Sequence, residues 1–269
     1  MMSRIRDRLT REGGLAPEAA EGAQRQRGVD RVIDLLEALL RARAPLRIGE
    51  LARRIDAPRS TTYSLVKLLL AADVLEASED GNAVYFGRAI GLYGHAYTER
   101  NPIHRLARPV LERLAREDGC TAQLCALHGD KYVVLDSVSA GGIFRITAEI
   151  GVPVPIPWTA SGRLLLAGRS DAEIRALIPA ADYDLPDGRR IDPAGFLENI
   201  RQARRDGFCV TTSLSDRFTS CLAAPLQDAQ GRVVATLCFV TAADQPAALK
   251  AGLVAALVAA AATLSASLP

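Results

Sequence analysis

Residues 46–75 read LRIGELARRIDAPRSTTYSLVKLLLAADVL and decide the fold of the first part of the chain. Apolar residues at helical spacing predict a short helix over 48–55, which ends at the tight break Asp56-Ala57-Pro58. A second helix is expected from Pro58, a residue that suits the first position of a helix, to about Ala72. Two short helices joined by such a break predict a helix-turn-helix.

The second of these helices has an apolar face and a face suited to a DNA groove. Leu65, Val66, Leu69 and Leu70 form the apolar face. The other face offers hydroxyl groups, a tyrosine and two cations, which can bind base edges and phosphates. We expect DNA contacts from Arg47, Arg59, Ser60, Thr61, Tyr63, Ser64 and Lys67, and from Asn82 in a minor groove.

The distribution of charge supports this interpretation better than the net charge of +2 does. Residues 41–72 contain seven cations and two acids, whereas residues 101–269 contain 17 of each. A local basic excess on a helix pair is typical of a surface that binds phosphates, although a solvated charged face gives the same pattern.

Around the helix pair, the pattern predicts a winged helix-turn-helix over residues 28–87. A helix over 30–43 precedes the pair, and strands at 74–76 and 83–86 flank an Asp-Gly-Asn turn. Residues 1–27 have few large apolar residues and are expected to form a mobile arm. A linker helix is predicted over 88–101, ended by Asn101-Pro102, where we place the domain boundary.

Residues 102–269 predict an α+β domain with an antiparallel sheet and flanking helices. Such a domain can hold a small ligand in an apolar pocket. The expected helices lie at 103–118, 159–167, 171–177, 193–206 and 247–267. The expected strands lie at 121–128, 131–138, 144–150, 208–212, 221–226 and 232–241.

Composition narrows the class of protein. Five cysteines without a Cys-x-x-Cys pair argue against a zinc site or a disulfide framework and fit a cytoplasmic protein. The N-terminal residues contain no secretory signal pattern. The uncharged stretch 251–269 is dominated by alanine, so we expect a packed C-terminal helix in preference to a membrane span.

The search for catalytic groups is mostly negative. His95, His104 and His128 have no second His or Cys at metal-ligand spacing, so no metal or cofactor is expected. Ser64 and Lys67 match Ser-x-x-Lys, but this match lies inside the proposed DNA-reading helix and has no partner motifs. We therefore expect no enzyme. The alternative is an enzyme that processes a small acid, with an appended winged helix.

Residues 158–163 form the segment of greatest interest in the second domain. Trp158-Thr-Ala-Ser-Gly-Arg163 follows Pro153, Pro155 and Pro157 and turns sharply into a helix. The hydroxyl groups of Thr159 and Ser161 would gather at the start of that helix, where a carboxylate can bind. An ordinary helix cap, with Trp158 in the core, explains the same residues equally well.

The order of these parts resembles the IclR (isocitrate lyase regulator) family of bacterial transcription regulators over about residues 28–268. In the first domain the matching residues are Gly28-Val-Asp-Arg31, Leu35-Leu36, Ile48-Gly-Glu-Leu-Ala52, Pro58-Arg-Ser-Thr61, Leu65-Val66 and Tyr85-Phe-Gly87. In the second they are Gly151-Val152 through Pro157, Thr159–Ala167, Asp206-Gly-Phe208, Cys221-Leu-Ala-Ala-Pro225 and Gly231-Arg-Val-Val-Ala235.

The resemblance implies a winged helix-turn-helix, a linker helix and a GAF-like effector domain over 102–269, assembled as a homodimer or homotetramer. It also implies an effector pocket near the helix that begins at 159, with small walls on neighbouring strands. Trp158 is expected to narrow this pocket or to stack on a ring of the ligand. The implied effector-binding residues are Trp158, Thr159, Ala160, Ser161, Gly162, Thr211, Cys221, Cys238 and Val240.

Together these features predict a cytoplasmic, ligand-responsive transcription regulator. Two recognition helices of a dimer would bind a pseudo-palindromic operator in double-stranded DNA. The second domain would sense a small organic or aromatic acid. Ligand binding would then change DNA binding through the linker helix.

Overall fold

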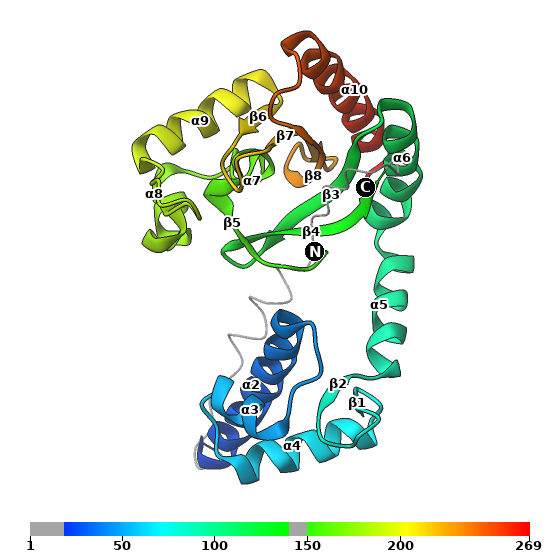
Figure 1. Cartoon of the computed structure of the whole chain (residues 1–269), viewed down its shortest axis with the longest axis vertical. Helices are drawn as coiled ribbons and strands as arrows, with labels where there is room; N and C mark the ends of the chain where they lie inside the picture. The colour runs from blue at the N-terminus through cyan, green and yellow to red at the C-terminus, as the bar shows by residue number, and fades with distance from the viewer. Residues whose placement is uncertain (1–18, 140–149) are drawn as a thin grey trace. The chain divides into compact units, whose positions relative to one another are not determined.

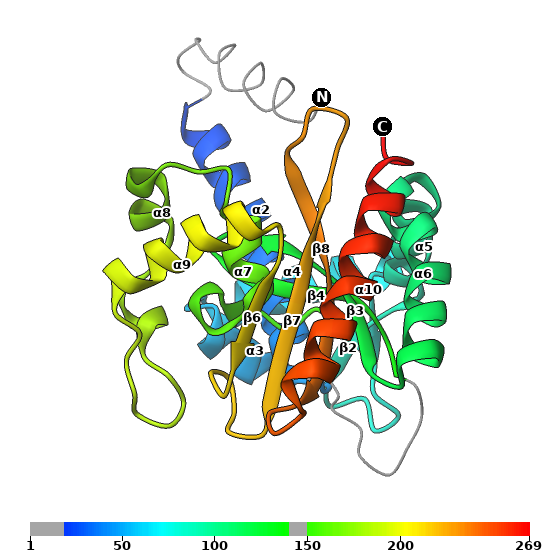
Figure 2. The ribbon, with the colours of Figure 1, turned by 90° about the horizontal axis from the view of Figure 1, so that it is seen from above.

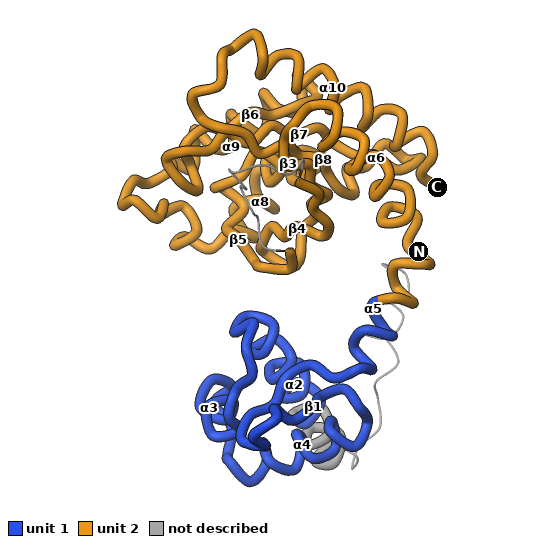
Figure 3. The backbone as a smooth tube through the Cα atoms, turned by 45° about the vertical axis from the view of Figure 1, so that its right-hand side comes forward, with its two compact units in different colours: residues 1–94 blue, residues 95–269 orange. Residues whose placement is uncertain are grey.

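The computed structural model describes residues 19–139 and 150–269, with side chains from residue 28 onward. The chain forms two compact units, Met1–Gly94 and His95–Pro269, which are coloured separately in Figure 3. The division falls inside a helix, α5 (Arg88–Arg100), the element predicted as a linker. A break at Asn101 separates α5 from α6 (Pro102–Asp118), as the Asn-Pro pair predicts.

The first unit contains the predicted helix-turn-helix (Figure 1). Its helices are α2 (Ala19–Ala42), α3 (Ile48–Arg54) and α4 (Arg59–Ala71). The helix α4 begins one residue after Pro58, which has extended backbone angles and occupies the N-cap position instead of the first helical position. Buried apolar side chains join the three helices in one core, and they include Leu35, Leu39, Leu51 and Val66.

The wing is a two-stranded antiparallel hairpin. Strands β1 (Leu75–Ala77) and β2 (Val84–Phe86) pair in the register Leu75 with Phe86 and Ala77 with Val84. Leu75 and Val84 are both buried in the core that the helices form, so the hairpin is fixed to the helix-turn-helix.

The helix α2 begins earlier than the sequence predicts. It starts at Ala19, so residues 19–27 are helical and the prediction of a mobile arm is wrong for them; residues 1–18 lie outside the described part of the chain. Residues 19–27 consist mainly of alanine, glutamine and arginine. These residues favour a helix even where few large apolar side chains are present.

The second unit is built on a six-stranded antiparallel sheet with the strand order β5-β4-β3-β8-β7-β6. The strands are β3 (Thr121–His128), β4 (Lys131–Val138), β5 (Val154–Pro155), β6 (Cys209–Thr212), β7 (Thr219–Gln227) and β8 (Val233–Ala242). The predicted strand at 144–150 lies outside the described residues except for Ile150, which forms an isolated bridge with Val134.

Helices cover both faces of this sheet (Figure 2). On one face lie α6 and α10 (Ala247–Ser265), and on the other lie α7 (Ala160–Leu165), α8 (Asp171–Leu177) and α9 (Pro193–Asp206). Alternate side chains of β8 pack on opposite faces of the sheet, as in any strand. Leu237 and Phe239 pack against α6 and α10. Cys238 and Val240 pack against α7.

The helix α10 is long and apolar enough to cross a membrane by length and composition alone. In the structure, Leu253, Leu257 and Leu264 are buried in the core formed with α6 and the sheet. The predicted packed C-terminal helix is therefore present.

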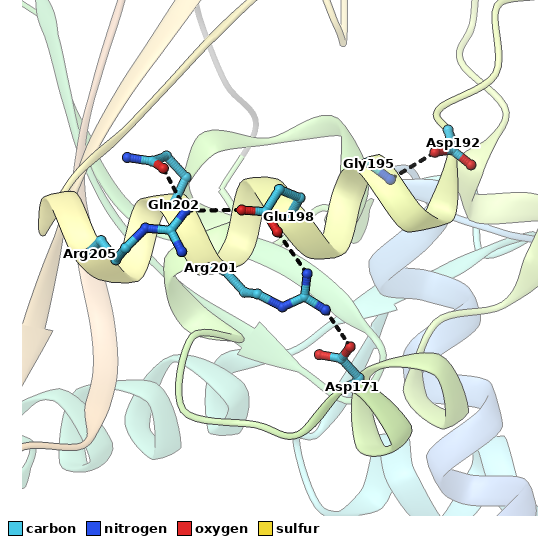
Figure 4. Close-up of polar contacts among 7 residues, drawn as sticks. All are labelled: Asp171, Asp192, Gly195, Glu198, Arg201, Gln202 and Arg205. Carbon is cyan, nitrogen blue, oxygen red and sulfur yellow. Dashed lines mark hydrogen bonds and ion pairs between the residues drawn. The ribbon is translucent and has the colours of Figure 1, made fainter.

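Ion pairs fasten α9 to α8 at the surface of the domain (Figure 4). Arg201 lies between Asp171 at the start of α8, at 2.6 Å, and Glu198 in the preceding turn of α9, at 2.8 Å. Arg205 binds the same Glu198 at 2.9 Å. These two α9 cations are thus satisfied by neighbouring acids.

Candidate ligand pocket and DNA-facing surface

The helix α4 presents most of the predicted DNA-binding side chains to solvent. Arg59, Ser60, Tyr63, Ser64 and Lys67 are exposed, and Thr61 is half-buried. Their neighbour Thr62 is fully buried, and its hydroxyl donates to the carbonyl oxygen of Pro58 at 3.1 Å. The apolar stripe of α4 thus faces the core, and the polar face remains free to meet a partner.

Arg59 also contacts the first helix of the pair. A Cβ atom built on Gly49 would lie 3.6 Å from Nη2 of Arg59, so the guanidinium extends over the start of α3. The absence of a side chain at Gly49 leaves room for this position. Arg47, one of the predicted contacts, is exposed at the N-cap of α3.

The turn of the wing holds its own polar groups. Asp80 accepts hydrogen bonds from the hydroxyl of Ser78 at 2.6 Å and from the backbone N–H and the side-chain amide of Asn82, each at 3.1 Å. These bonds, above all the one from Ser78, lower the pKa of Asp80 to about 2. Asn82 is exposed, and one of the two N–H groups of its amide binds Asp80, which leaves the other N–H able to donate. Its contact with a minor groove stays a prediction.

The second unit contains a cavity of about 290 Å³ between the sheet and α7. This volume is near the lower end of small-molecule sites, which measure roughly 300–1,000 Å³. The four adjacent central strands β4, β3, β8 and β7, the edge strand β5, the first residues of α7 and the loop before β7 form its walls. The lining residues are Gln123, Tyr132, Val134, Val152, Val154, Thr159, Ala160, Ser161, Ser215, Asp216, Thr219, Cys221, Cys238 and Val240.

Two buried polar groups of this pocket have no partner among the described residues. They are the amide nitrogen of Gln123 and the hydroxyl oxygen of Ser161, and both side chains are 1% exposed. A buried donor without an acceptor costs about 1–3 kcal/mol, so such groups are rare in a structural core. Two of the four such groups among the described residues line this one pocket.

The side chains of Thr159, Asp216 and Thr219, which also line the pocket, form local hydrogen bonds. The hydroxyl of Thr159 caps α7 by accepting from the backbone N–H of Gly162 at 2.9 Å. The carboxylate of Asp216 accepts from the backbone N–H of Phe218 at 2.7 Å and from the hydroxyl of Thr219 at 2.6 Å. In the segment at 158–163, Thr159 is therefore an ordinary helix cap. Ser161 lines the pocket, and its hydroxyl has no partner among the described residues. Binding of a carboxylate by this segment stays a prediction.

Three thiols gather at the floor of the pocket on neighbouring strands. The thiol of Cys238 is hydrogen-bonded to those of Cys125 and Cys221, and the hydroxyl of Tyr132 donates to Cys125 at 3.0 Å. The bond from Cys238 lowers the pKa of Cys221, while the bonds at Cys238, together with its burial, raise its own pKa well above the usual range. Among residues 19–139 and 150–269, no group of three ligands is placed to hold a metal ion.

The structure brings together six of the nine predicted effector residues and separates three. Trp158 points its indole N–H at the carbonyl oxygen of Asp182, at 2.9 Å, and does not line the pocket. Gly162 packs against Ile156, away from the cavity. Thr211 lies on the edge strand β6, where it lines a different cavity. These three residues do not line the cavity, and their contact with an effector stays a prediction. The residues found together are Thr159, Ala160, Ser161, Cys221, Cys238 and Val240.

Sequence reasoning missed the most informative residue, Gln123. A glutamine in the middle of the otherwise apolar strand 121–128 is a signal that could have identified it. Its register partner across β3 and β8 is Cys238, which was predicted. Gln123 lies in the pocket because β3 pairs with β8 in the register that puts Gln123 beside Cys238. The sequence pattern predicts the strands but does not predict which strands pair.

Comparisons with known proteins agree with this architecture. Residues 28–79 match the IclR helix-turn-helix domain, and residues 95–266 match the family described as bacterial transcriptional regulator IclR C-terminal. The HTH-type transcriptional regulator BhcR of Paracoccus denitrificans (strain Pd 1222) is 28% identical over 226 residues, covering 84% of this chain and 80% of BhcR.

Solved structures share the fold. An IclR transcriptional regulator from Alicyclobacillus acidocaldarius superposes with a TM-score of 0.80 at 21% identity, covering 89% of this chain and 98% of that one. An IclR homologue from Microbacterium hydrocarbonoxydans, complexed with 4-hydroxybenzoate, superposes with a TM-score of 0.76 at 22% identity, covering 90% and 98%.

Proposed function

This chain belongs to the IclR family of bacterial transcriptional regulators, and from this premise we propose which surface reads DNA and which pocket receives the effector. As a member of that family it is a ligand-responsive, DNA-binding regulator of transcription. We propose that it acts in the cytoplasm and catalyses no reaction.

We propose that the effector is a small organic or aromatic acid bound between the sheet and α7. The observation that carries this proposal is the pair of buried polar groups without partners, the amide of Gln123 and the hydroxyl of Ser161. Oxygen atoms of a carboxyl group can accept from both of them. The apolar walls formed by Val134, Val154 and Val240 would hold the remainder of the ligand.

We propose that α4 enters the major groove of an operator. Arg59, Ser60 and Tyr63 are exposed in its N-terminal half, which is the part of a recognition helix that contacts bases, and Lys67 is exposed about one turn further along. A homodimer or homotetramer would place two such helices on the half-sites of a pseudo-palindrome. The linker helix α5 would transmit the effect of the ligand from the pocket to this assembly.

The direct test combines two measurements on the full chain. Fluorescence anisotropy with DNA from upstream of its own gene, at low and moderate salt, is expected to show tighter binding than random DNA of equal length. A thermal-shift screen of organic and aromatic acids is expected to find compounds that raise the melting temperature, because a ligand stabilises the folded state that binds it.

An acid that raises the melting temperature and also changes the affinity for the upstream DNA would support the whole proposal. Equal binding to both DNAs at every salt concentration would contradict the assignment of α4 as a sequence reader. A hit whose thermal shift is unchanged in Gln123→Leu would contradict the assignment of the pocket.

A further inference from the structure

Arg163, on the side of α7 away from the proposed effector pocket, is a buried cation. Its side chain is 3% exposed, and its guanidinium lies 5.1 Å from the centre of the Phe196 ring. The Nη1 group donates to the carbonyl oxygens of Pro157 at 3.0 Å and Thr159 at 2.8 Å. Arg163 therefore holds the segment that leads into α7.

No acidic side chain of the described residues forms an ion pair with Arg163. Burial lowers the pKa of its guanidinium, because burial disfavours the charged form. The cations of the neighbouring helix α9 differ in this respect, because Arg201 and Arg205 both bind acids (Figure 4). A buried charge without a counter-charge is costly, and proteins retain such groups mainly where they bind something.

Arg163 has unused donors and lines a second cavity. Two backbone carbonyls occupy Nη1, which leaves Nε and Nη2 without a partner among the described residues. Arg163 lines a cavity of about 490 Å³ together with Asn199, Gln202, Cys209, Thr211 and Leu214. Asp206 also lines it, but its carboxylate accepts from the amide of Gln202 at 2.7 Å. No residue lines both this cavity and the proposed effector pocket.

We propose that this cavity is a second ligand site, which binds a small carboxylate on the Nε and Nη2 edge of Arg163. Two N–H groups on one edge of a guanidinium match the two oxygens of a carboxylate, and such bidentate bonds are among the stronger ones in proteins. Amide and hydroxyl groups of Asn199 and Thr211 border the cavity and are able to bind further polar atoms of the ligand.

The position of Arg163 couples this site to the effector pocket. The same guanidinium that would bind the carboxylate also holds the carbonyl of Thr159, and the side chain of Thr159 lines the effector pocket. A carboxylate that draws Arg163 toward the second cavity would therefore change the hold on Thr159. Occupation of one site is expected to alter affinity at the other, and such coupling is reciprocal.

Trp158 provides the readout, because it is the single tryptophan of the chain and lies between the two residues whose carbonyls Arg163 binds. We would titrate the full chain with succinate at constant ionic strength and follow tryptophan emission, with sodium chloride and inorganic phosphate as comparison anions. A saturable change with succinate, weaker with phosphate and absent with chloride, is expected.

Arg163→Met should weaken the succinate response about tenfold or more, since it removes a charged bidentate partner. Arg204→Met removes an exposed cation from α9 and should leave the response intact. Asn199→Asp puts a negative charge at the exposed border of the cavity and should weaken the succinate response several-fold. Because Asn199 is exposed, this change should not disturb the core. It therefore tests the proposal even if Arg163→Met fails to fold. Gln123→Leu changes the effector pocket and therefore tests whether succinate acts from that pocket instead.

Any of four outcomes would overturn the second site. The first three are the absence of a saturable response in the wild-type chain, a response that survives in both Arg163→Met and Asn199→Asp, and a response to phosphate stronger than that to succinate. A response lost in Gln123→Leu but kept in Arg163→Met would place the carboxylate in the effector pocket and would also overturn it.

Discussion

Gly162 lies so close to Ile156 that a Cβ atom on Gly162 would stand 2.4 Å from the carbonyl oxygen of Ile156. The same Cβ would lie 2.7 Å from Cγ2 of Ile156. This contact brings the segment before α7 back onto the first turn of the helix, where Thr159 and Ser161 meet the pocket. The glycine is thus needed for close packing, and it does not line the cavity.

Gly162→Ala is therefore expected to destabilise the second unit by about 1–3 kcal/mol, the usual cost of overpacking a buried site. Urea unfolding followed by circular dichroism would measure it. Gly168→Ala is the matched control, because a Cβ at the exposed Gly168 would meet nothing within 4 Å. Equal stability of the two variants would contradict this prediction, because it would show that the segment before α7 can shift to accommodate the new Cβ atom at little cost.

Gln123→Leu should separate stability from ligand binding. The buried amide nitrogen of Gln123 has no described partner, so its replacement by an apolar side chain removes a desolvation cost and should stabilise the ligand-free protein by about 1 kcal/mol. The same change removes a donor from the pocket and should abolish the thermal shift caused by an acid effector. A variant that loses stability and keeps the shift would contradict the proposed role of Gln123.

Cys221 should react with iodoacetamide faster than Cys120 near neutral pH. Both cysteines are half-buried, but a hydrogen bond with Cys238 lowers the pKa of Cys221, whereas burial raises the pKa of Cys120. Mass spectrometry after brief alkylation would give the two rates. Cys238→Ala is expected to slow the reaction at Cys221 only, and an effector should protect Cys221 only. Equal protection of both cysteines would point to global stabilisation in place of pocket occupancy.

The elements of the fold were largely predictable, because each has a local signal. Each signal depends on residues that are near in sequence. Examples are the apolar spacing that includes Leu51 and Val66 in the helix pair, the helix end at Gly119 and the Asp-Gly turn of the wing. The start of α2 was predicted too late, because residues 19–27 have little of the amphipathic spacing on which the prediction of a helix over 30–43 depended.

The candidate site was only partly predictable, because its walls come from strands that pair across long sequence separations. The segment at 159–161 and the small residues Cys221, Cys238 and Val240 were found. Thr211 was misplaced because β6 is the edge strand, and its side chain lies beyond the pocket formed by the central strands. Trp158 was misplaced because its bonding partner, the carbonyl of Asp182, belongs to a segment that no local pattern links to it.

The wing should lose stability in acid because of Asp80. Its pKa is lowered from 3.8 to about 2 by bonds from Ser78 and Asn82, so its stabilising contribution is complete above the unfolded value of 3.8 and is lost as pH falls toward 2. Carboxyl-detected NMR should find the Asp80 midpoint near 2, and Ser78→Ala should move it toward 3.8. The variant Asp80→Asn lacks this titration, so its stability should vary less over the same interval of pH. A midpoint of 3.8 in the wild-type chain would exclude the hydrogen-bonded turn in solution.

Arg59→Ala tests whether α4 reads bases. A guanidinium that contacts a base edge contributes about 1–3 kcal/mol of discrimination, so the variant should lose about tenfold or more in affinity for the upstream operator and much less for random DNA. Anisotropy titrations with both DNAs at two salt concentrations would measure this difference. Arg41→Ala is the control, because Arg41 is exposed on α2 and is already paired with Glu37 at 2.6 Å. An equal loss on both DNAs would make Arg59 a phosphate contact, since such contacts add affinity without sequence preference. Base reading would then have to come from neighbouring side chains such as Ser60 and Tyr63, which are exposed on the same helix.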